Sequence, residues 1–172
     1  IELSHLPIFI ITGDFMKKKI NIPLLILNLA IPLAVGGISG FMIRNAVEDY
    51  KTLPKPPLSP PSWVFPVVWT ILFILMGISS YLIATSDHEG KKQAFIIYGL
   101  QLAVNFLWSP VFFIAKKYLL AFFILLILIV LVSAMISAFS QISKPAGRLQ
   151  IPYLLWLLFA GYLNFGVYLL NR

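Results

Sequence analysis

The chain has 172 residues, 60% of them hydrophobic and 11% charged, with 13 basic side chains against 6 acidic ones and a net charge of +7. Soluble domains are about half apolar and about a quarter charged, and a fold of this size cannot bury so much apolar surface. The composition therefore excludes a soluble domain and a disordered chain, and the absence of cysteine excludes a disulfide scaffold or thiolate site. The sequence predicts an all-α integral membrane protein with about five crossings of about 20 residues each.

The first 15 residues differ from the rest of the chain. Their apolar stretch is too short to span a membrane, and Met16 followed by three lysines resembles the start of a membrane protein. We expect residues 1–15 to be a cloning remnant or a misassigned start. Residues 16–172 are expected to form a single membrane domain of five helices.

The first crossing is predicted at residues 20–43, because its apolar run exceeds that of a cleaved signal peptide. Pro32 is expected to kink this helix, since proline removes a backbone hydrogen bond and clashes with the preceding turn. Gly36 and Gly40 form a GxxxG pair, which permits close helix approach and would carry dimer contacts if it faces a second chain.

A proline-rich loop is predicted at residues 44–62. Five of the chain's 12 prolines lie between Pro54 and Pro61. Such a run favours an extended, polyproline-like backbone. The loop is therefore expected to be stiff, and to form a lid or rim rather than a slack linker.

Four further crossings are predicted from apolar runs separated by short polar loops. They are 63–84, 95–114, 118–139 and 151–170. Because the loops are short, consecutive helices are expected to be antiparallel neighbours in a bundle. Sheets are excluded, because the runs lack the alternation of a membrane barrel.

Basic residues gather in the loops, as cations do at lipid head groups. No basic face with interleaved aromatic residues lies outside the crossings, so no nucleic-acid partner is expected. The triple lysine at 17–19 favours an N-terminus inside the cell, since the first helix usually dominates orientation. The Lys-, Ile- and Leu-rich composition indicates a bacterial cell membrane.

The predicted crossings contain no Asp, Glu, Lys, Arg or His. Proton relays and ion-coupled pumps place ionisable groups at this depth, and acid–base catalysis needs them as well. Haem held as a cofactor would need an axial side chain at the iron. The residues therefore favour a binding protein over an enzyme, with no metal and no resident cofactor.

Polar and aromatic side chains recur at helical spacing along one face of each of four crossings. These stripes are Asn28, Pro32, Val35 and Ser39; Trp69, Phe73, Met76 and Ser80; Gln101, Asn105, Trp108 and Phe112; and Tyr153, Trp156, Ala160 and Asn164. They could wall a cavity for a large, flat, mostly apolar ligand. They could equally join helices through amide hydrogen bonds, with no ligand involved. Spacing leaves both interpretations open.

Three segments resemble, in order, the motifs of the TspO/translocator protein family, also called tryptophan-rich sensory proteins or peripheral-type benzodiazepine receptors. They run from Lys55 to Thr70, from Gln101 to Ser109, and from Pro152 to Asn164. The resemblance covers about Lys17 to Arg172. It implies a five-helix bundle, commonly a homodimer, that binds porphyrins, isoquinoline- or benzodiazepine-type drugs and, in some members, cholesterol.

The resemblance also implies a set of ligand-binding residues in the first loop and in the second, third and fifth helices. These are Tyr50, Pro60, Pro61, Trp69, Asn105, Trp108, Phe112, Trp156, Ala160 and Asn164. It implies a membrane receptor or carrier for porphyrins and other flat hydrophobic molecules. Two alternatives stay open: a light- and oxygen-dependent enzyme that degrades protoporphyrin, and a regulatory or structural membrane protein without a ligand cavity.

Overall fold

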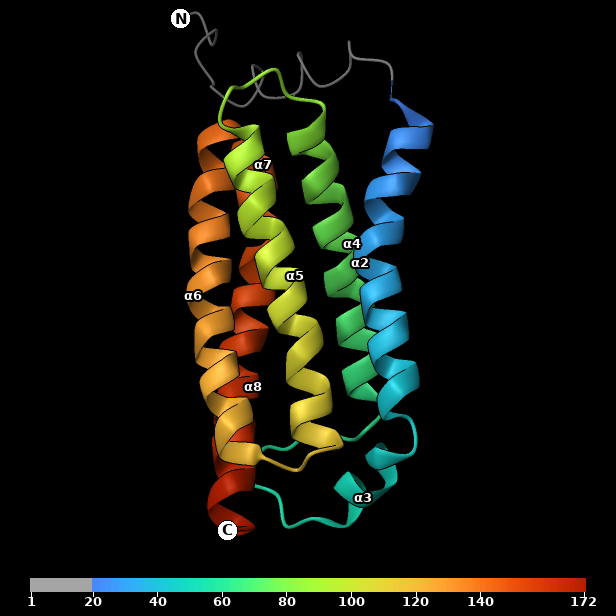
Figure 1. The fold of residues 1–172 in the computed structure, drawn as a ribbon, viewed down its shortest axis with the longest axis vertical. Helices are drawn as coiled ribbons and strands as arrows, with labels where there is room; N and C mark the ends of the chain where they lie inside the picture. The colour runs from blue at the N-terminus through green and yellow to red at the C-terminus, as the bar shows by residue number, and fades with distance from the viewer. Residues whose placement is uncertain (1–19) are drawn as a thin grey trace, which may run out of the picture.

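The computed structural model describes residues 20–172, and over this range the chain forms five long helices, two short ones and no strand (Figure 1). The long helices are α2 (Ile22–Ile43), α4 (Val64–Ala84), α5 (Lys91–Phe113), α6 (Tyr118–Ile142) and α8 (Ile151–Leu170), and the short ones are α3 (Ala46–Thr52) and α7 (Lys144–Arg148). Each long helix is long and apolar enough to cross a membrane. The prediction of an all-α bundle of five membrane-spanning helices is confirmed. The expectations for residues 1–15 and for the lysines at 17–19 lie outside the described residues.

Local sequence explains where α2 begins. The side chain of Asn21 accepts a hydrogen bond from the Leu24 amide at 3.1 Å, which caps the helix, and Pro23 stands in the first turn, where a missing amide costs nothing. The helix then runs through Pro32 to Ile43 as one continuous element. Tertiary packing therefore holds helical backbone on both sides of the proline.

Two helices extend beyond the apolar runs that predicted them. α5 begins at Lys91 rather than at residue 95, and α6 ends at Ile142 rather than at residue 139. The short helices α3 and α7 occupy segments predicted as loops. Hydropathy marks only the part of a helix that lies in lipid, whereas backbone hydrogen bonding continues into polar residues.

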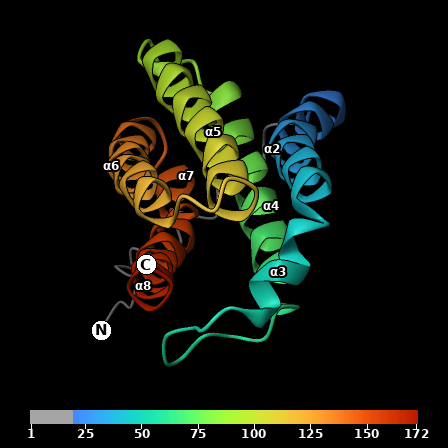
Figure 2. The same ribbon diagram turned by 60° about the horizontal axis from the view of Figure 1, so that its bottom comes forward.

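The long helices close into a ring whose order differs from their order in the sequence (Figures 1 and 2). α2 packs on α4 and α5, α5 on α6, and α6 on α8. α8 completes the ring through side chains, with the Trp69 and Tyr153 rings 6.0 Å apart. The expectation that consecutive helices are neighbours does not hold for α4 and α5, which touch each other little. The space between them is where the candidate site lies.

The end of the bundle opposite α3 is closed by α7 (Figure 1). The Ser79 hydroxyl of α4 donates to the Ala146 carbonyl at 2.7 Å, and Gly147 lies directly against Ser140 of α6. The Gln150 amide donates to the Leu75 carbonyl at 3.3 Å. Buried polar side chains thus fix this end, and the open space lies toward α3.

Candidate functional site

The segment after α2 covers one end of the bundle (Figure 2). α3 carries Tyr50, whose ring is buried and lies 6.2 Å from Phe65, 5.8 Å from Phe112 and 5.5 Å from Phe113. These contacts join α3 to the start of α4 and to the end of α5. Burial raises the pKa of the Tyr50 hydroxyl, so this side chain stays neutral across the physiological range.

The proline-rich stretch after α3 crosses to α8 before it returns to α4 (Figures 1 and 2). The Tyr162 hydroxyl of α8 donates to the Pro57 carbonyl at 2.8 Å, and the Asn171 amide donates to the Pro54 carbonyl at 3.0 Å. A Cβ at Gly166 would lie 2.6 Å from the Pro56 ring, so only glycine allows this contact. The stretch is therefore held to α8 at three points, as expected of a stiff rim.

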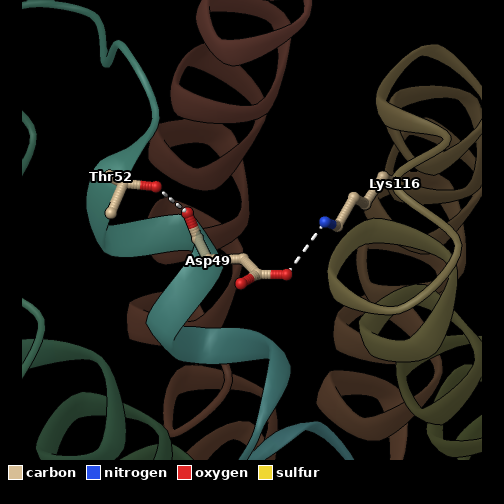
Figure 3. A network of polar contacts seen from close by, with 3 residues as sticks. All are labelled: Asp49, Thr52 and Lys116. Carbon is tan, nitrogen blue, oxygen red and sulfur yellow. Dashed lines mark hydrogen bonds and ion pairs between the residues drawn. The ribbon is translucent and has the colours of Figure 1, made fainter.

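One ion pair holds α3 from the other side (Figure 3). Lys116, in the turn between α5 and α6, lies 2.8 Å from a carboxylate oxygen of Asp49 on α3. The Thr52 hydroxyl donates to the main-chain oxygen of the same aspartate at 2.8 Å. The hydrogen bond to Asp49 raises the pKa of Lys116 above its ordinary value of 10.5. The pair therefore contributes to docking of α3 below pH 10.5, and this contribution is lost as pH rises through the raised pKa.

We predict that Asp49→Asn loosens α3, because the cation of Lys116 loses its partner. Backbone amides of α3 should exchange with solvent a few-fold faster, measured by hydrogen–deuterium exchange. High salt should have the same effect on the unaltered protein, since both side chains are exposed. The control is Glu48→Gln, whose partner Lys51 lies within α3 itself. Equal exchange in the two variants would show that the Asp49 pair does not dock α3.

A cavity of about 430 Å³ lies between α2, α4 and α5, at the end of the bundle that α3 covers. This volume is within the range of small-molecule sites. Its lining consists of Leu33, Gly36, Gly37, Ser39, Gly40, Ile43, Val47, Tyr50, Ser62, Phe65, Pro66, Trp69, Thr70, Phe73, Asn105, Trp108, Ser109 and Phe113. Among the described residues, the lining contains aromatic rings, glycines and neutral polar groups, and every member is uncharged. The cavity is thus suited to a flat, mostly apolar molecule.

An amide network lies behind the α5 wall of the cavity. The Asn105 amide donates to the Tyr153 hydroxyl of α8 at 2.7 Å, and this hydroxyl donates to the Gln101 side-chain oxygen at 3.1 Å. All three side chains are buried. The predicted polar stripes of α5 and α8 therefore face each other and are joined by side-chain hydrogen bonds. The helix-joining interpretation requires such bonds.

A second set of hydrogen bonds fixes the indole of Trp108. Its ring nitrogen donates to the Asn164 side-chain oxygen at 3.1 Å, and the Asn164 amide donates to the Tyr118 carbonyl at 2.8 Å. One side chain of α8 thus ties α5 to the start of α6. It also sets the orientation of an indole that faces the cavity.

The ten residues implied by the family resemblance divide into two groups. Tyr50, Trp69, Asn105 and Trp108 line the cavity. Pro60, Pro61, Phe112, Trp156, Ala160 and Asn164 lie outside its lining. The first group comes from α3, α4 and α5, whereas three of the second group belong to α8.

Several residues of the second group contact the wall from behind. Phe112 stacks on Trp108 with ring centres 5.2 Å apart, and Trp156 lies 5.9 Å from Phe65. Pro60 and Pro61 precede α4 in the extended stretch, and Ala160 is buried in the core between helices. Phe112 and Trp156 thus support lining residues, and none of the six borders the space.

The α2 side of the cavity is missing from the residue set that the sequence implied. Gly36, Gly37 and Gly40 form this wall together with Ser39. From the sequence, the GxxxG pair of Gly36 and Gly40 indicates only a close contact between helices. Gly36 does pack closely against Phe73 of α4. The signal that could have identified the wall is the position of Ser39 on the polar stripe of the first crossing.

Within residues 20–172, no group of three or more His, Asp or Glu side chains is placed to hold a metal ion. The uncharged lining of the cavity offers stacking on indole and phenyl rings, together with neutral hydrogen bonds.

Comparison with known proteins connects this architecture to one family. The sequence model of the TspO/MBR family matches residues 28–170. The chain is 36% identical over 158 residues to the tryptophan-rich protein TspO of Chlorobaculum tepidum, covering 91% of this chain and 99% of that protein. It is 42% identical over 124 residues to the tryptophan-rich sensory protein of Cereibacter sphaeroides, covering 72% and 77%, and 40% identical over 142 residues to the translocator protein of Ovis aries, covering 80% and 84%. The chain is therefore a multi-pass integral membrane protein that belongs to the TspO/MBR family.

Proposed function

We propose that the protein is a membrane receptor or carrier that binds porphyrins and isoquinoline- or benzodiazepine-type molecules in the cavity next to α3. The observation that carries this proposal is an uncharged cavity of about 430 Å³ walled by the indoles of Trp69 and Trp108. Flat aromatic ligands gain dispersion and quadrupole contacts from such rings.

The polar groups of the cavity support the same ligand class. The Trp108 indole uses its single N–H on Asn164, so this donor is not free for a ligand, and the Asn105 amide uses one of its two N–H groups on Tyr153. The remaining polar atoms at the lining are neutral. A ligand with a large apolar face and one or two neutral polar groups satisfies this lining at low desolvation cost.

Size divides the ligand classes. The cavity volume lies in the lower half of the range for drug-sized sites, so an isoquinoline or benzodiazepine would be enclosed. A porphyrin is larger, and part of its ring would project from the cavity. Its acidic groups would then lie toward the head-group region near α3, where basic residues are present.

We predict that protoporphyrin quenches the tryptophan fluorescence of the purified protein in a saturable manner. Trp69→Phe should weaken binding by about fivefold, since loss of part of an aromatic contact costs about 1 kcal/mol. The measurement is a fluorescence titration in detergent at constant protein concentration.

The matched control is Trp63→Phe. Trp63 is 67% exposed and lies outside the cavity lining, so its replacement should leave the dissociation constant unchanged. Absence of saturable quenching in the unaltered protein would overturn the proposed function. Equal weakening by both substitutions would place the ligand elsewhere on the molecule.

The hydrogen-bond network favours a second role for part of the polar stripes. Asn105, Tyr153 and Gln101 form a chain of two hydrogen bonds between α5 and α8, which stabilises the bundle with or without a ligand. A purely structural or regulatory protein would show this network and no saturable binding. The same titration therefore separates the two functions. The third candidate function, a porphyrin-degrading enzyme, is tested by illuminating the bound porphyrin. An enzyme should make the porphyrin bleach faster than it does in detergent alone.

We also propose a bacterial cell membrane, an N-terminus inside the cell, and a homodimer. The lysines at 17–19 support the orientation, because cations before the first crossing favour the cytoplasmic side. In this orientation α3 lies at the outer face. Crosslinking in intact membranes tests the dimer through a band at twice the monomer mass.

A further inference from the structure

The exposed residues of the cavity lining all lie on one side of the cavity, on α2 and α4. On α2, Leu33 is 37% exposed, and Gly37 and Gly40 are exposed as well. On α4, Pro66 and Thr70 are exposed. The lining residues of α5 are all buried or half-buried. The opening therefore lies along the seam between α2 and α4, which are both membrane-spanning helices.

Glycine placement explains why this seam is closed at one end and open at the other. A Cβ at Gly77 would lie 2.7 Å from the Leu29 Cα, so the two helices touch at that level. Toward α3, a Cβ at Gly37 or Gly40 would meet no atom within 4 Å. Gly36 still packs directly against the Phe73 ring of α4, so the gap is confined to the side of α2 that carries Gly37 and Gly40.

By contrast, the end of the cavity that faces water, next to α3, is closed. Tyr50 packs against rings from α4 and α5, and only about 20 Å³ of space remains on its other side, between α3 and the turn at Lys116. A ligand from water would have to displace α3, whereas a ligand dissolved in the bilayer meets only the glycine gap.

Two buried polar residues of the cavity lining each carry an oxygen without a hydrogen-bond partner in the described range. Asn105 is 5% exposed and donates through its nitrogen, but its side-chain oxygen accepts no hydrogen bond within the described chain. Ser39, 7% exposed on α2, has no hydrogen-bond partner for its hydroxyl in the same range. Within residues 20–172, the fully buried side-chain polar atoms without a partner are Tyr98 Oη, Gln150 Oε1 and Trp156 Nε1. The Asn105 and Ser39 oxygens are not among them, and both residues line the cavity.

We infer that ligands reach the cavity sideways from the bilayer, through the α2–α4 seam, with Gly37 and Gly40 setting the width of the passage. This inference rests on the proposed function and specifies its ligand class. The ligand partitions into lipid, presents an uncharged face to the cavity, and carries a hydrogen-bond donor for the Asn105 oxygen. The Ser39 hydroxyl supplies a second polar contact on the facing wall.

The chain contains no cysteine, so a single introduced thiol can block the passage reversibly. Gly37→Cys, in lipid nanodiscs, is treated with a benzyl methanethiosulfonate, and protoporphyrin association is followed by tryptophan quenching. The adduct should slow association by about tenfold or more, equivalent to about 1.4 kcal/mol on the barrier, and a reductant should restore the rate. The matched control is Gly99→Cys on α5, which is exposed, has no atom within 4 Å of its Cβ position and lies outside the cavity.

Each outcome decides the inference. Saturable quenching whose rate is unchanged by the adduct at position 37, or slowed equally at position 99, overturns the lateral passage and leaves the proposed function intact. If the unmodified protein shows no saturable quenching, the proposed function fails, and bilayer-dissolved bromooctane then serves as the probe in a Trp63→Phe background. Quenching of the three remaining tryptophans that falls with the adduct at position 37 supports the passage, and unchanged quenching overturns it.

Discussion

Gly77→Ala is expected to destabilise the bundle by about 1–3 kcal/mol, the usual cost of forcing extra volume into a packed interface. The added Cβ would lie 2.7 Å from the Leu29 Cα and 3.0 Å from the Asn28 carbonyl oxygen. Because the first contact is with backbone, a side-chain rotation cannot relieve it, and α2 has to move away from α4. The measurement is the thermal unfolding midpoint in detergent, which should fall by several degrees.

The control for this prediction is Gly37→Ala on the facing helix. A Cβ at Gly37 meets no atom within 4 Å, and alanine favours helix over glycine by about 1 kcal/mol. The unfolding midpoint should therefore stay constant or rise. A fall of equal size in both variants would mean that α2 and α4 do not make their closest approach at Gly77.

Asn164→Ala is expected to lower stability by about 1–2 kcal/mol, because membrane-buried polar side chains contribute about this much when they join helices. The substitution removes the acceptor of the Trp108 indole and the donor to the Tyr118 carbonyl. The indole nitrogen is then left without a partner in the interior, which adds a desolvation penalty. The unfolding midpoint in detergent again gives the measurement.

A double-mutant cycle with Trp108→Phe tests the cause of this loss. Phenylalanine removes the donor that Asn164 satisfies, so the two substitutions together should cost less than their sum. Additive losses would show that the hydrogen bond between Trp108 and Asn164 is not the stabilising contact. Protoporphyrin affinity should fall in Asn164→Ala only through the freed rotation of Trp108, since Asn164 lies outside the cavity lining.

The sequence was sufficient to predict the five crossings and the inward direction of their polar stripes. Gln101, Asn105, Tyr153 and Asn164 are all buried, as their helical spacing indicated. Which stripe meets which could not be predicted, because hydrogen bonds such as that between Asn105 and Tyr153 join residues 48 positions apart. Periodicity defines a face, and only tertiary packing defines its partner.

The cavity was predictable on its aromatic side and missed on its glycine side. Trp69 and Trp108 can be identified from the sequence by their size and helical spacing. Gly37 and Gly40 can be assigned to the cavity wall only when the residues opposite them are known. The helix α3 was also missed, since seven residues after a crossing leave little periodic signal. Its place depends on Tyr50 and on the Asp49 ion pair, and both are contacts with distant segments.

The uncharged lining of the cavity has a consequence for energetics across the membrane. Moving one elementary charge through a potential of 100 mV changes its free energy by about 2.3 kcal/mol. A neutral ligand in an uncharged site carries no charge through the potential, so its binding free energy does not depend on the voltage. Occupancy by a neutral ligand should therefore be the same in energised and de-energised membranes. The occupancy would then depend on the concentration of neutral ligand in the lipid phase and not on the voltage across it.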